Sequence, residues 1–358
     1  MVHSRGSRVP GLYLVPRSRH FRHLRRVLPA GCHNAALFSI GLACGLAACF
    51  RVLNLLHPQQ PVPPAIAEPK IVLLPKAHVP WSYDLSSTAL YNASDWVAKL
   101  LHSRVRVLCW VLTHPNNIRL KARHVAATWG RRCTKVFFMS TKSDKGLSSA
   151  LELSVSENRN ALWAKTKASL VELYNKHYHD YDWFLKADDD TYVVMENLRF
   201  FLLDKDPSKP AYFGYPFRVL VKGGYVSGGS GYVLSREALR LIIQEGLTLY
   251  GRCRADSKGS EDVEIARCLS PIGIQPEDTR DALGRHRFFP VRLESFLVPG
   301  LLHPKFWLWW YSTHPIRPGR NCCSDTAASF HYIKPGSMYV YEFFVYHVRV
   351  LGATNQHF

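Results

Sequence analysis

The first 67 residues of this 358-residue chain contain no aspartate and no glutamate, although they contain eight arginines. From Val27 to Phe50 lysine and arginine are absent as well, so this stretch carries no formal charge. A bilayer core needs about 20 apolar residues as helix, and the stretch is long enough. Seven arginines precede it, which favours a cytoplasmic N-terminus. The pattern predicts a cytoplasmic basic tail over residues 1–26 and a transmembrane signal anchor over residues 27–56.

Two other interpretations of the apolar run remain. A cleaved signal peptide usually has a shorter basic segment than these 26 residues. A buried core helix would need neighbouring elements to cover it. A signal anchor predicts a single-pass type II membrane protein, in which the chain after the anchor lies in a lumen. Seven prolines between residues 57 and 80 exclude regular helix or sheet there, so residues 57–100 are predicted to be an extended stem.

The chain also lacks several motifs that would indicate other functions. No Cys-x-x-Cys pair is present, which argues against a structural zinc site. The phosphate-binding Gly-x4-Gly-Lys-Ser/Thr loop is absent, and no dinucleotide-binding glycine fingerprint follows the first predicted strand. The net charge is +19, but residues 1–67 supply +8 of it and no nucleic-acid-binding motif occurs. Nucleic acid is therefore not an expected partner.

Six cysteines follow the stem, and in an oxidising lumen they are expected to form disulfides. Six cysteines allow 15 pairings, among which Cys109–Cys133 and Cys253–Cys268 are plausible, and the connectivity is left open. The adjacent Cys322 and Cys323 either have different partners or form a vicinal bridge. Asn92 begins the only glycosylation sequon, Asn-Ala-Ser, and whether it is glycosylated is left open.

Apolar runs alternate with amphipathic segments after the stem. The predicted strands are residues 105–112, 135–139, 183–187 and 211–214, and the predicted helices are residues 118–129, 161–178 and 197–203. Residues 141–158 are polar and predicted to be a loop. This alternation predicts an α/β fold with a mostly parallel central sheet flanked by helices. In such sheets, ligands bind beyond the carboxyl ends of the strands.

The acidic triplet Asp188-Asp189-Asp190 directly follows the third predicted strand. Adjacent carboxylates repel one another, and their oxygens are ligands that hard divalent ions such as Mg²⁺ or Mn²⁺ prefer. Such an ion neutralises charge on a departing diphosphate. The alternative is a solvated turn that caps the next helix. The triplet alone does not exclude a phosphatase or a nuclease.

Two later segments are also candidates for a ligand site. Residues 223–231 contain five glycines, which let backbone approach a ligand closely or simply form a flexible hairpin. Ser260 is the predicted N-cap of a helix that runs through Cys268. Glu261 and Asp262 in its first turn suit the helix dipole, and one of them is alternatively a general base for a substrate hydroxyl.

At this point the sequence resembles a known family. Residues 183–192, Trp-Phe-Leu-Lys-Ala-Asp-Asp-Asp-Thr-Tyr, are similar to the donor and metal segment of the beta-1,3-glycosyltransferases of family 31. Within that family the chain resembles the core 1 beta-1,3-galactosyltransferases, through residues 110–113, 224–229, 321–325 and 329–332. The likeness extends over residues 103–350.

The resemblance implies a GT-A-type catalytic domain over residues 101–358, held in the Golgi membrane with the domain in the lumen. The reaction it implies is an inverting transfer of galactose from UDP-galactose to the 3-hydroxyl of GalNAc-alpha-Ser/Thr, which forms the core 1 O-glycan, or T antigen. Mn²⁺ is the implied cofactor. Implied partners are GalNAc-bearing glycoproteins, the UDP-sugar, a second copy of the chain and a dedicated chaperone.

The resemblance also assigns roles to residues of this chain. Asp188 and Asp190 match the D-x-D positions that bind the metal and the donor, and His331 looks like a further metal ligand. The alternative for His331 is a buried histidine in an aromatic cluster. Asp262 matches the catalytic base, and Glu261 is the second candidate for that role.

Weaker expectations concern the donor and acceptor surroundings. Thr113 and Arg123 are expected to line the nucleotide site, and Lys165 and Lys186 to offset diphosphate charge, with surface lysines as the alternative. The residues expected to border the sugar are Tyr225, Gly228 and Gly229. Trp307 or Trp310 is expected to stack on the acceptor, although core packing is the alternative for both.

Three rival functions remain. A fringe-like beta-1,3-N-acetylglucosaminyltransferase would use the same fold and metal. A chaperone-like paralogue without catalytic activity would lack the acidic metal motif, which this chain has. A lectin-like binding protein is the third. One departure from the family is the arginine-rich leader, which is longer than the short cytoplasmic tail usual there.

Overall fold

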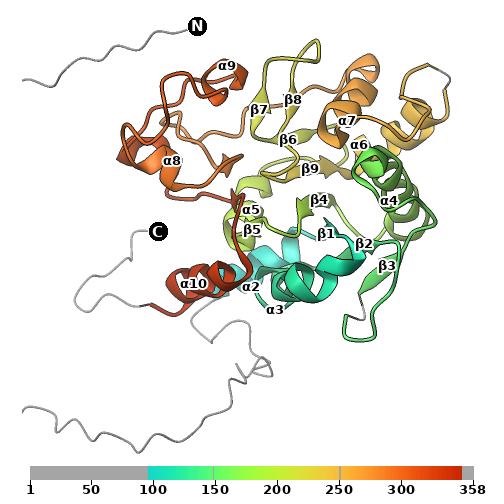
Figure 1. Ribbon diagram of the computed structural model, residues 1–358, viewed down its shortest axis with the longest axis horizontal. Coiled ribbons are helices and arrows are strands. Elements are labelled where there is room, and N and C mark those ends of the chain that lie inside the picture. Colours follow the sequence, from blue (N-terminus) through green and yellow to red (C-terminus); the bar gives the residue numbers. More distant parts are fainter. Residues whose placement is uncertain (1–95, 148, 250, 349–358) are drawn as a thin grey trace, which may run out of the picture. The chain divides into compact units, whose positions relative to one another are not determined.

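The structure is a computed structural model that describes residues 96–348 except residues 148 and 250 (Figure 1). The predicted basic tail, signal anchor and nearly all of the stem lie outside the described residues. No helix within residues 96–348 is long and apolar enough to cross a membrane. The first described helix, α2 (Trp96–Arg104), spans the predicted boundary between stem and catalytic domain at residue 100.

A six-stranded mixed sheet forms the centre of the domain, in the order β3-β2-β1-β4-β9-β6. Strands β3, β2, β1 and β4 are parallel, whereas β9 pairs antiparallel with both β4 and β6. The bounds are β1 Val107–Leu112, β2 Lys135–Ser140, β3 Ala150–Glu152, β4 Trp183–Asp188, β6 Tyr212–Gly214 and β9 Tyr232–Ser235. The predicted α/β fold with a mostly parallel sheet is confirmed.

Helices flank this sheet in two groups (Figure 1). In one group α4 packs against α6 and α7; in the other α2 packs against α5, and α3 against α10. Every residue of β1 is buried, as its unbroken apolar run requires for a strand covered on both faces. The remaining α-helices are α3 Arg123–Ala127, α4 Leu162–His177, α5 Met195–Leu202, α6 Arg236–Leu241, α7 Glu261–Leu269, α8 Glu294–Leu297, α9 Leu308–Tyr311 and α10 Pro335–Tyr346.

Short helical turns join these elements. They are η1 Pro115–Asn117, η2 Ile118–Ala122, η3 Trp129–Arg132, η4 Arg159–Ala161, η5 Ile242–Leu247, η6 Ser270–Ile272 and η7 Arg320–Cys322. The predicted helix over residues 118–129 is therefore divided between η2, α3 and the start of η3. The predicted loop over residues 141–158 is wrong in one part, because β3 adds to the edge of the sheet beside β2. Its sequence, Ala-Leu-Glu, and its partial exposure suit a short edge strand.

Two small sheets complete the domain. One has the order β10-β11-β5, and the other pairs β7 with β8. Their bounds are β5 Tyr192–Val193, β7 Pro216–Phe217, β8 Tyr225–Val226, β10 Phe288–Phe289 and β11 Ser329–Phe330. Strand β11 runs antiparallel to β5, with Phe330 opposite Tyr192. Because β5 follows the acidic triplet directly, this pairing brings residue 331 to the triplet.

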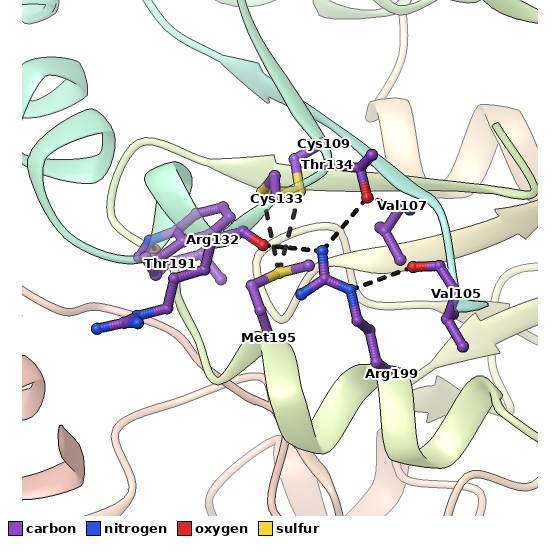
Figure 2. The surroundings of a disulfide bond; sticks show 10 residues. Val105, Val107, Cys109, Arg132, Cys133, Thr134, Thr191, Met195 and Arg199 are labelled. Atoms are coloured by element: carbon purple, nitrogen blue, oxygen red, sulfur yellow. Dashed lines mark hydrogen bonds between the residues drawn. A yellow bond between two sulfur atoms is a disulfide. The ribbon is translucent and has the colours of Figure 1, made fainter. Parts of the chain in front are cut away.

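The two plausible pairs are confirmed as disulfides, and Cys322 and Cys323 form the vicinal bridge rather than bonds to separate partners. Cys109–Cys133 links β1 to the segment before β2, and the Met195 sulfur lies 4.0 and 3.9 Å from its two sulfurs (Figure 2). Beside it, the fully buried Arg199 donates hydrogen bonds to the carbonyl oxygens of Val105 and Arg132. This disulfide and Arg199 thus tie together the start of the sheet.

Candidate active site

The acidic triplet lies at the carboxyl end of β4, beside the end of β1, as the strand order requires. Asp188 is the last residue of the strand, and Asp189 and Asp190 form a tight turn after it. Thr191 closes that turn: its backbone N–H donates to the Asp188 carbonyl oxygen at 3.1 Å. The Thr191 hydroxyl donates to the carbonyl oxygen of Gly229 at 2.8 Å, so the turn is also fixed to the glycine-rich loop.

The structure brings the three predicted metal ligands together. Asp188, Asp190 and His331 each offer one ligand atom, and these atoms lie within 4.8 Å of one another. His331 Nε2 is 3.4 Å from Asp190 Oδ1, and its Nδ1 is 2.9 Å from the carbonyl oxygen of Pro290. Two carboxylates and an imidazole form a donor set that suits Mn²⁺ or another divalent ion. The residues present therefore fit the expected metal.

The charges around Asp190 favour its ionised form. Burial by itself opposes ionisation, but the hydrogen bond with His331 and the charges of His331 and Lys121 lower the pKa of Asp190 below its ordinary value. Burial likewise opposes protonation of His331, yet Asp190 and Asp188 raise its pKa. Without a bound cation, the imidazole and the carboxylate thus stabilise one another.

Asp189, the middle residue of the triplet, is bound by the protein itself. It accepts hydrogen bonds from the Thr113 hydroxyl at 2.8 Å and from the Asn117 amide at 3.1 Å, and Lys121 Nζ lies 3.2 Å away. Burial raises the pKa of Asp189. Asn117 and Lys121 were missed in the sequence. Their spacing of four residues in a segment predicted to be largely helical was the signal that could have placed both beside the triplet.

One cavity of about 460 Å³ opens over the triplet and is called here the triplet cavity. It contains predicted site residues Thr113, Lys165, Asp188, Asp190 and His331, and the rest of its lining is Leu112, His114, Asn117, Glu157, Asn158, Leu162, Asp189 and Tyr332. The buried Lys165 donates to the Thr113 carbonyl oxygen at 2.6 Å and to Glu157 at 2.7 Å. Lys165 is therefore a buried, paired lysine rather than a surface one.

A second cavity of about 510 Å³ is called the α7 cavity, because its floor is the start of α7. Its predicted site residues are Lys186, Gly228, Gly229, Glu261 and Asp262, and it is also lined by Leu112, Asn160, Leu162, Asp188, Gly259 and Ser260. Both cavities share Asp188, Leu112 and Leu162. A ligand that fills one cavity can therefore meet a ligand in the other at Asp188.

The first two acidic residues of α7, Glu261 and Asp262, differ in their contacts. Glu261 lies 2.6 Å from Lys186 Nζ and accepts a hydrogen bond from the Tyr232 hydroxyl at 3.2 Å. Burial raises the pKa of Glu261 to about 7. Asp262 accepts backbone N–H bonds from Gly228 at 3.2 Å and Val263 at 2.9 Å, and burial raises its pKa as well.

Ser260 occupies the N-cap position of α7 as predicted, but its side chain makes no capping hydrogen bond. Its carbonyl oxygen instead accepts from the backbone N–H groups of Val263 and Glu264. The carboxylate of Asp262, bonded to the Val263 N–H, satisfies a donor that a capping hydroxyl usually takes. The helix start thus orients Asp262 directly.

Gly229 is a glycine because the imidazole of His331 leaves no room for a side chain. A Cβ placed there would lie 2.0 Å from Cε1 of His331. The glycine-rich loop therefore allows backbone to approach the metal ligands closely, as its composition suggested, and it includes β8 rather than being a simple flexible hairpin.

The remaining predicted residues do not line either cavity. Arg123 is exposed and donates to His124, and Tyr225 is buried in β8 against Phe217. Trp307 packs on Phe217 and Tyr311 while keeping 39% of its surface exposed, and Trp310 is 52% exposed. These tryptophans are thus partly available for stacking rather than buried in the core.

The triplet cavity contains an oxygen-rich cation site, and the α7 cavity contains the carboxyl pair Glu261 and Asp262. The two cavities share Asp188. A metal-bound diphosphate fits the triplet cavity, and a neutral hydroxyl compound that must lose a proton fits the α7 cavity. Sugar transfer from a nucleotide diphosphate requires both functions in one place. The geometry supports that class of reaction.

Comparison with known proteins identifies relatives with this chemistry. Residues 113–281 match the family described as Fringe-like. A glycoprotein-N-acetylgalactosamine 3-beta-galactosyltransferase 1 from Xenopus laevis is 42% identical over 257 residues, which cover 72% of this chain and 70% of the relative. A mouse beta-1,3-glucosyltransferase is 29% identical over 154 residues, covering 42% of this chain and 30% of that protein.

More distant likenesses involve smaller parts or weaker matches. Human chondroitin sulfate synthase 3 is 33% identical over 121 residues, covering 30% of this chain and 13% of that protein. Among solved structures, the galactosyltransferase LgtC in complex with donor and acceptor sugar analogues has a TM-score of 0.37 and 12% identity, covering 68% of this chain and 97% of that chain. That structural likeness is too slight to carry an argument.

The match to the Xenopus enzyme does carry one, because 42% identity over 72% of this chain and 70% of the relative is enough to show the family. The chain belongs to the Fringe-like beta-1,3-glycosyltransferases of family 31, within the group of the glycoprotein-N-acetylgalactosamine 3-beta-galactosyltransferases.

Proposed function

We propose that this protein transfers galactose from UDP-galactose to the 3-hydroxyl of GalNAc on serine or threonine of glycoproteins, with inversion at the anomeric carbon. The product is the core 1 O-glycan. The observation that carries the proposal is the meeting of the two cavities at Asp188, with a metal-binding triad on one side and the Glu261–Asp262 pair on the other. Membership of the galactosyltransferase group supports the choice of sugar and acceptor.

The triplet cavity takes the donor in this proposal. Asp188, Asp190 and His331 would hold Mn²⁺, which when bound supplies positive charge to the diphosphate. The protein's own contribution is orientation: Lys121 and the Thr113 hydroxyl hold Asp189, and Asp189 in turn fixes the turn that carries both metal-binding carboxylates. The buried ion pair of Lys165 and Glu157 closes the far wall.

The α7 cavity takes the acceptor, and Asp262 is the proposed general base. Its carboxylate removes the proton of the 3-hydroxyl while that oxygen attacks the anomeric carbon of galactose. The bond from that carbon to the UDP oxygen breaks, and UDP leaves with the electron pair. A carboxylate whose pKa is raised by burial accepts a proton more readily than an exposed one. Glu261 is less suited, because Lys186 and Tyr232 already occupy its oxygens.

The proposed location is the Golgi membrane, with the catalytic domain in the lumen. The arginine-rich segment before an uncharged run of 24 residues supports a type II anchor. The three disulfides support an oxidising compartment. Assembly with a second copy or with a dedicated chaperone stays a prediction.

The test uses the full-length chain in detergent with UDP-galactose, Mn²⁺ and a peptide that carries GalNAc-alpha-Thr. We expect beta-1,3-linked galactose on the peptide, identified by NMR, and much slower transfer from UDP-N-acetylglucosamine. Faster transfer from UDP-N-acetylglucosamine would instead indicate a fringe-like enzyme, which the Fringe-like match makes the second candidate. No turnover with intact folding would favour a non-catalytic paralogue.

Asp190→Ala tests the proposed donor site in the triplet cavity. It removes one of three metal ligands from a turn that Asp189 and Thr191 continue to hold, so folding should persist. We expect isothermal titration calorimetry to detect no Mn²⁺-dependent binding of UDP to this variant. Unchanged binding would remove Asp190 from the metal site.

A further inference from the structure

Lys186 is a fully buried cation at the junction of the two cavities. It lies on β4, two residues before Asp188, and is 1% exposed. Its Nζ is 2.8 Å from Asp188 Oδ1, 2.6 Å from Glu261 Oε1 and 3.1 Å from the carbonyl oxygen of Gly228. A lysine ammonium has three N–H donors, and three oxygens surround this one.

These contacts do not suit the role predicted from the sequence, in which Lys186 offsets the charge of the diphosphate. A lysine that binds phosphate keeps at least one donor facing the ligand. Here the ammonium donates to Asp188 and Gly228, is ion-paired with Glu261 Oε1 at 2.6 Å, and is enclosed.

The contacts of Lys186 instead form a continuous connection to the proposed base. Lys186 holds the carbonyl of Gly228, and the backbone N–H of the same glycine donates to Asp262 Oδ2 at 3.2 Å. A Cβ on Gly228 would lie 2.5 Å from Glu261 Oε1 and 3.2 Å from Lys186 Nζ. The glycine thus leaves the space in which the ammonium and the carboxylate meet.

We propose that Lys186 is a positioning residue that fixes the proposed base, Asp262, relative to the metal-binding Asp188, by bonding Asp188, Glu261 and the Gly228 loop at once. This inference rests on the proposed transfer reaction. Reacting groups misplaced by about 1 Å can lose on the order of 100-fold in rate. Loss of Lys186 is therefore expected to reduce the rate of transfer more than the affinity for the donor nucleotide.

The experiment compares Lys186→Met with Arg199→Met in the full-length chain. Both changes remove a buried cation, but Arg199 lies beside the Cys109–Cys133 disulfide and bonds backbone away from both cavities (Figure 2). The thermal midpoint of each variant is measured first, and kinetics are then measured well below it. For Lys186→Met we expect kcat to fall by about 100-fold, while the affinity for UDP in the presence of Mn²⁺ changes by less than about tenfold.

Arg199→Met should lose thermal stability and keep kcat within about threefold, which shows what loss of a buried cation does without any positioning role. Two results would overturn the inference for Lys186. A kcat near that of the wild type would leave only a contribution to stability. A large loss of UDP affinity with kcat retained would make Lys186 a diphosphate contact after all.

If Lys186→Met does not fold, Gly228→Ala tests the same connection with the lysine in place. Its added methyl group would lie 2.5 Å from Glu261 Oε1 and 3.2 Å from both Lys186 Nζ and Asp262 Cβ, so it disturbs every group of this connection, and the same loss in kcat with UDP affinity kept is expected. A Gly228→Ala enzyme with full kcat would contradict the proposal. Wild-type protein that transfers no galactose would instead contradict the proposed function, so the two failures are distinguishable.

Discussion

The two cavities on either side of Asp188 neutralise their carboxylates in different ways. In the triplet cavity, Asp189 and Asp190 face Lys121, which keeps 34% of its side chain exposed and lies 3.6 Å from Asp190. In the α7 cavity, Lys186 is enclosed and in contact with Asp188 and Glu261. In the triplet cavity, a metal ion can therefore replace Lys121 beside the carboxylates. In the α7 cavity, the enclosed Lys186 already neutralises them.

The proton affinities of Asp190 and of the two α7 carboxylates also differ, whereas Asp189, which the protein itself binds, has a pKa raised by burial. The pKa of Asp190 is lowered by His331 and Lys121 despite its burial, whereas burial raises the pKa of both Glu261 and Asp262. Carboxyl groups whose pKa values are pushed apart usually have separate roles. One side of Asp188 is therefore suited to bind a cation and the other to accept a proton.

The largest expected effect comes from Asp262→Asn, which breaks the α7 side alone. The amide keeps the shape of the carboxylate but cannot accept a proton from the acceptor hydroxyl. We expect kcat for transfer to fall by about 10³-fold. Calorimetry should show UDP binding with Mn²⁺ like that of the wild type. Normal turnover would remove Asp262 from the role of base and leave Glu261 as the candidate.

The second prediction concerns how the stability of the folded protein depends on pH through Glu261, and it tests the contrast in proton affinity. Because the pKa of Glu261 is raised from 4.5 to about 7, the folded protein binds this proton more tightly than the unfolded chain does. The stabilisation is therefore complete below pH 4.5 and is lost as pH rises through about 7. Over this range the free energy of unfolding falls by roughly 3 kcal/mol.

Glu261→Gln removes this titration and provides the control. In metal-free buffer, the thermal midpoint of the wild type should fall relative to that of the variant between about pH 5 and pH 8. The charge of Asp262 raises the pKa of Glu261, so the difference between the two proteins reports the Glu261–Asp262 pair. Parallel pH profiles of the two proteins would show that Glu261 does not titrate in this range.

A smaller effect is expected from Gly229→Ala, which disturbs the contact between the glycine-rich loop and His331. The added Cβ would lie 2.0 Å from Cε1 of His331, so the imidazole must move away from Asp190. We expect activity to fall by on the order of 100-fold, with Mn²⁺-dependent UDP binding weakened as well.

His331→Ala provides the background for that test. Without the imidazole there is space for the methyl group, so Gly229→Ala should add little to the defect of His331→Ala. Independent, additive losses in the double variant would show that Gly229 acts in some other way.

Much of the donor side was predictable because its signals are local. An apolar run followed by Asp188-Asp189-Asp190 predicted a buried strand with carboxylates at its end, and β4 confirms it. The alternation of strands and helices likewise predicted the parallel part of the sheet. His331 came only from the family resemblance, because the pairing of β11 with β5 joins residues about 140 positions apart.

The contacts that distinguish the triplet cavity from the α7 cavity could not be predicted from local sequence patterns. Periodicity places Lys186 inside a strand but does not say that Glu261 and Gly228, from two other elements, surround it. Residues 150–152, Ala-Leu-Glu, were predicted to be loop because the segment around them is polar and three residues are too few to show the alternation of a strand. Arg123, expected at the nucleotide site because of its place on the helix after the first strand, is instead exposed beside His124.

The bond between His331 and Pro290 has one more consequence. A carbonyl oxygen only accepts, so Nδ1 must keep its hydrogen and the imidazole is held in a single tautomer. The lone pair is thereby left on Nε2, on the side of Asp190, where an incoming cation competes with a proton for the same atom. The Pro290 carbonyl thus decides which nitrogen faces the cation, and protonation of that nitrogen makes cation binding depend on the acidity of the compartment.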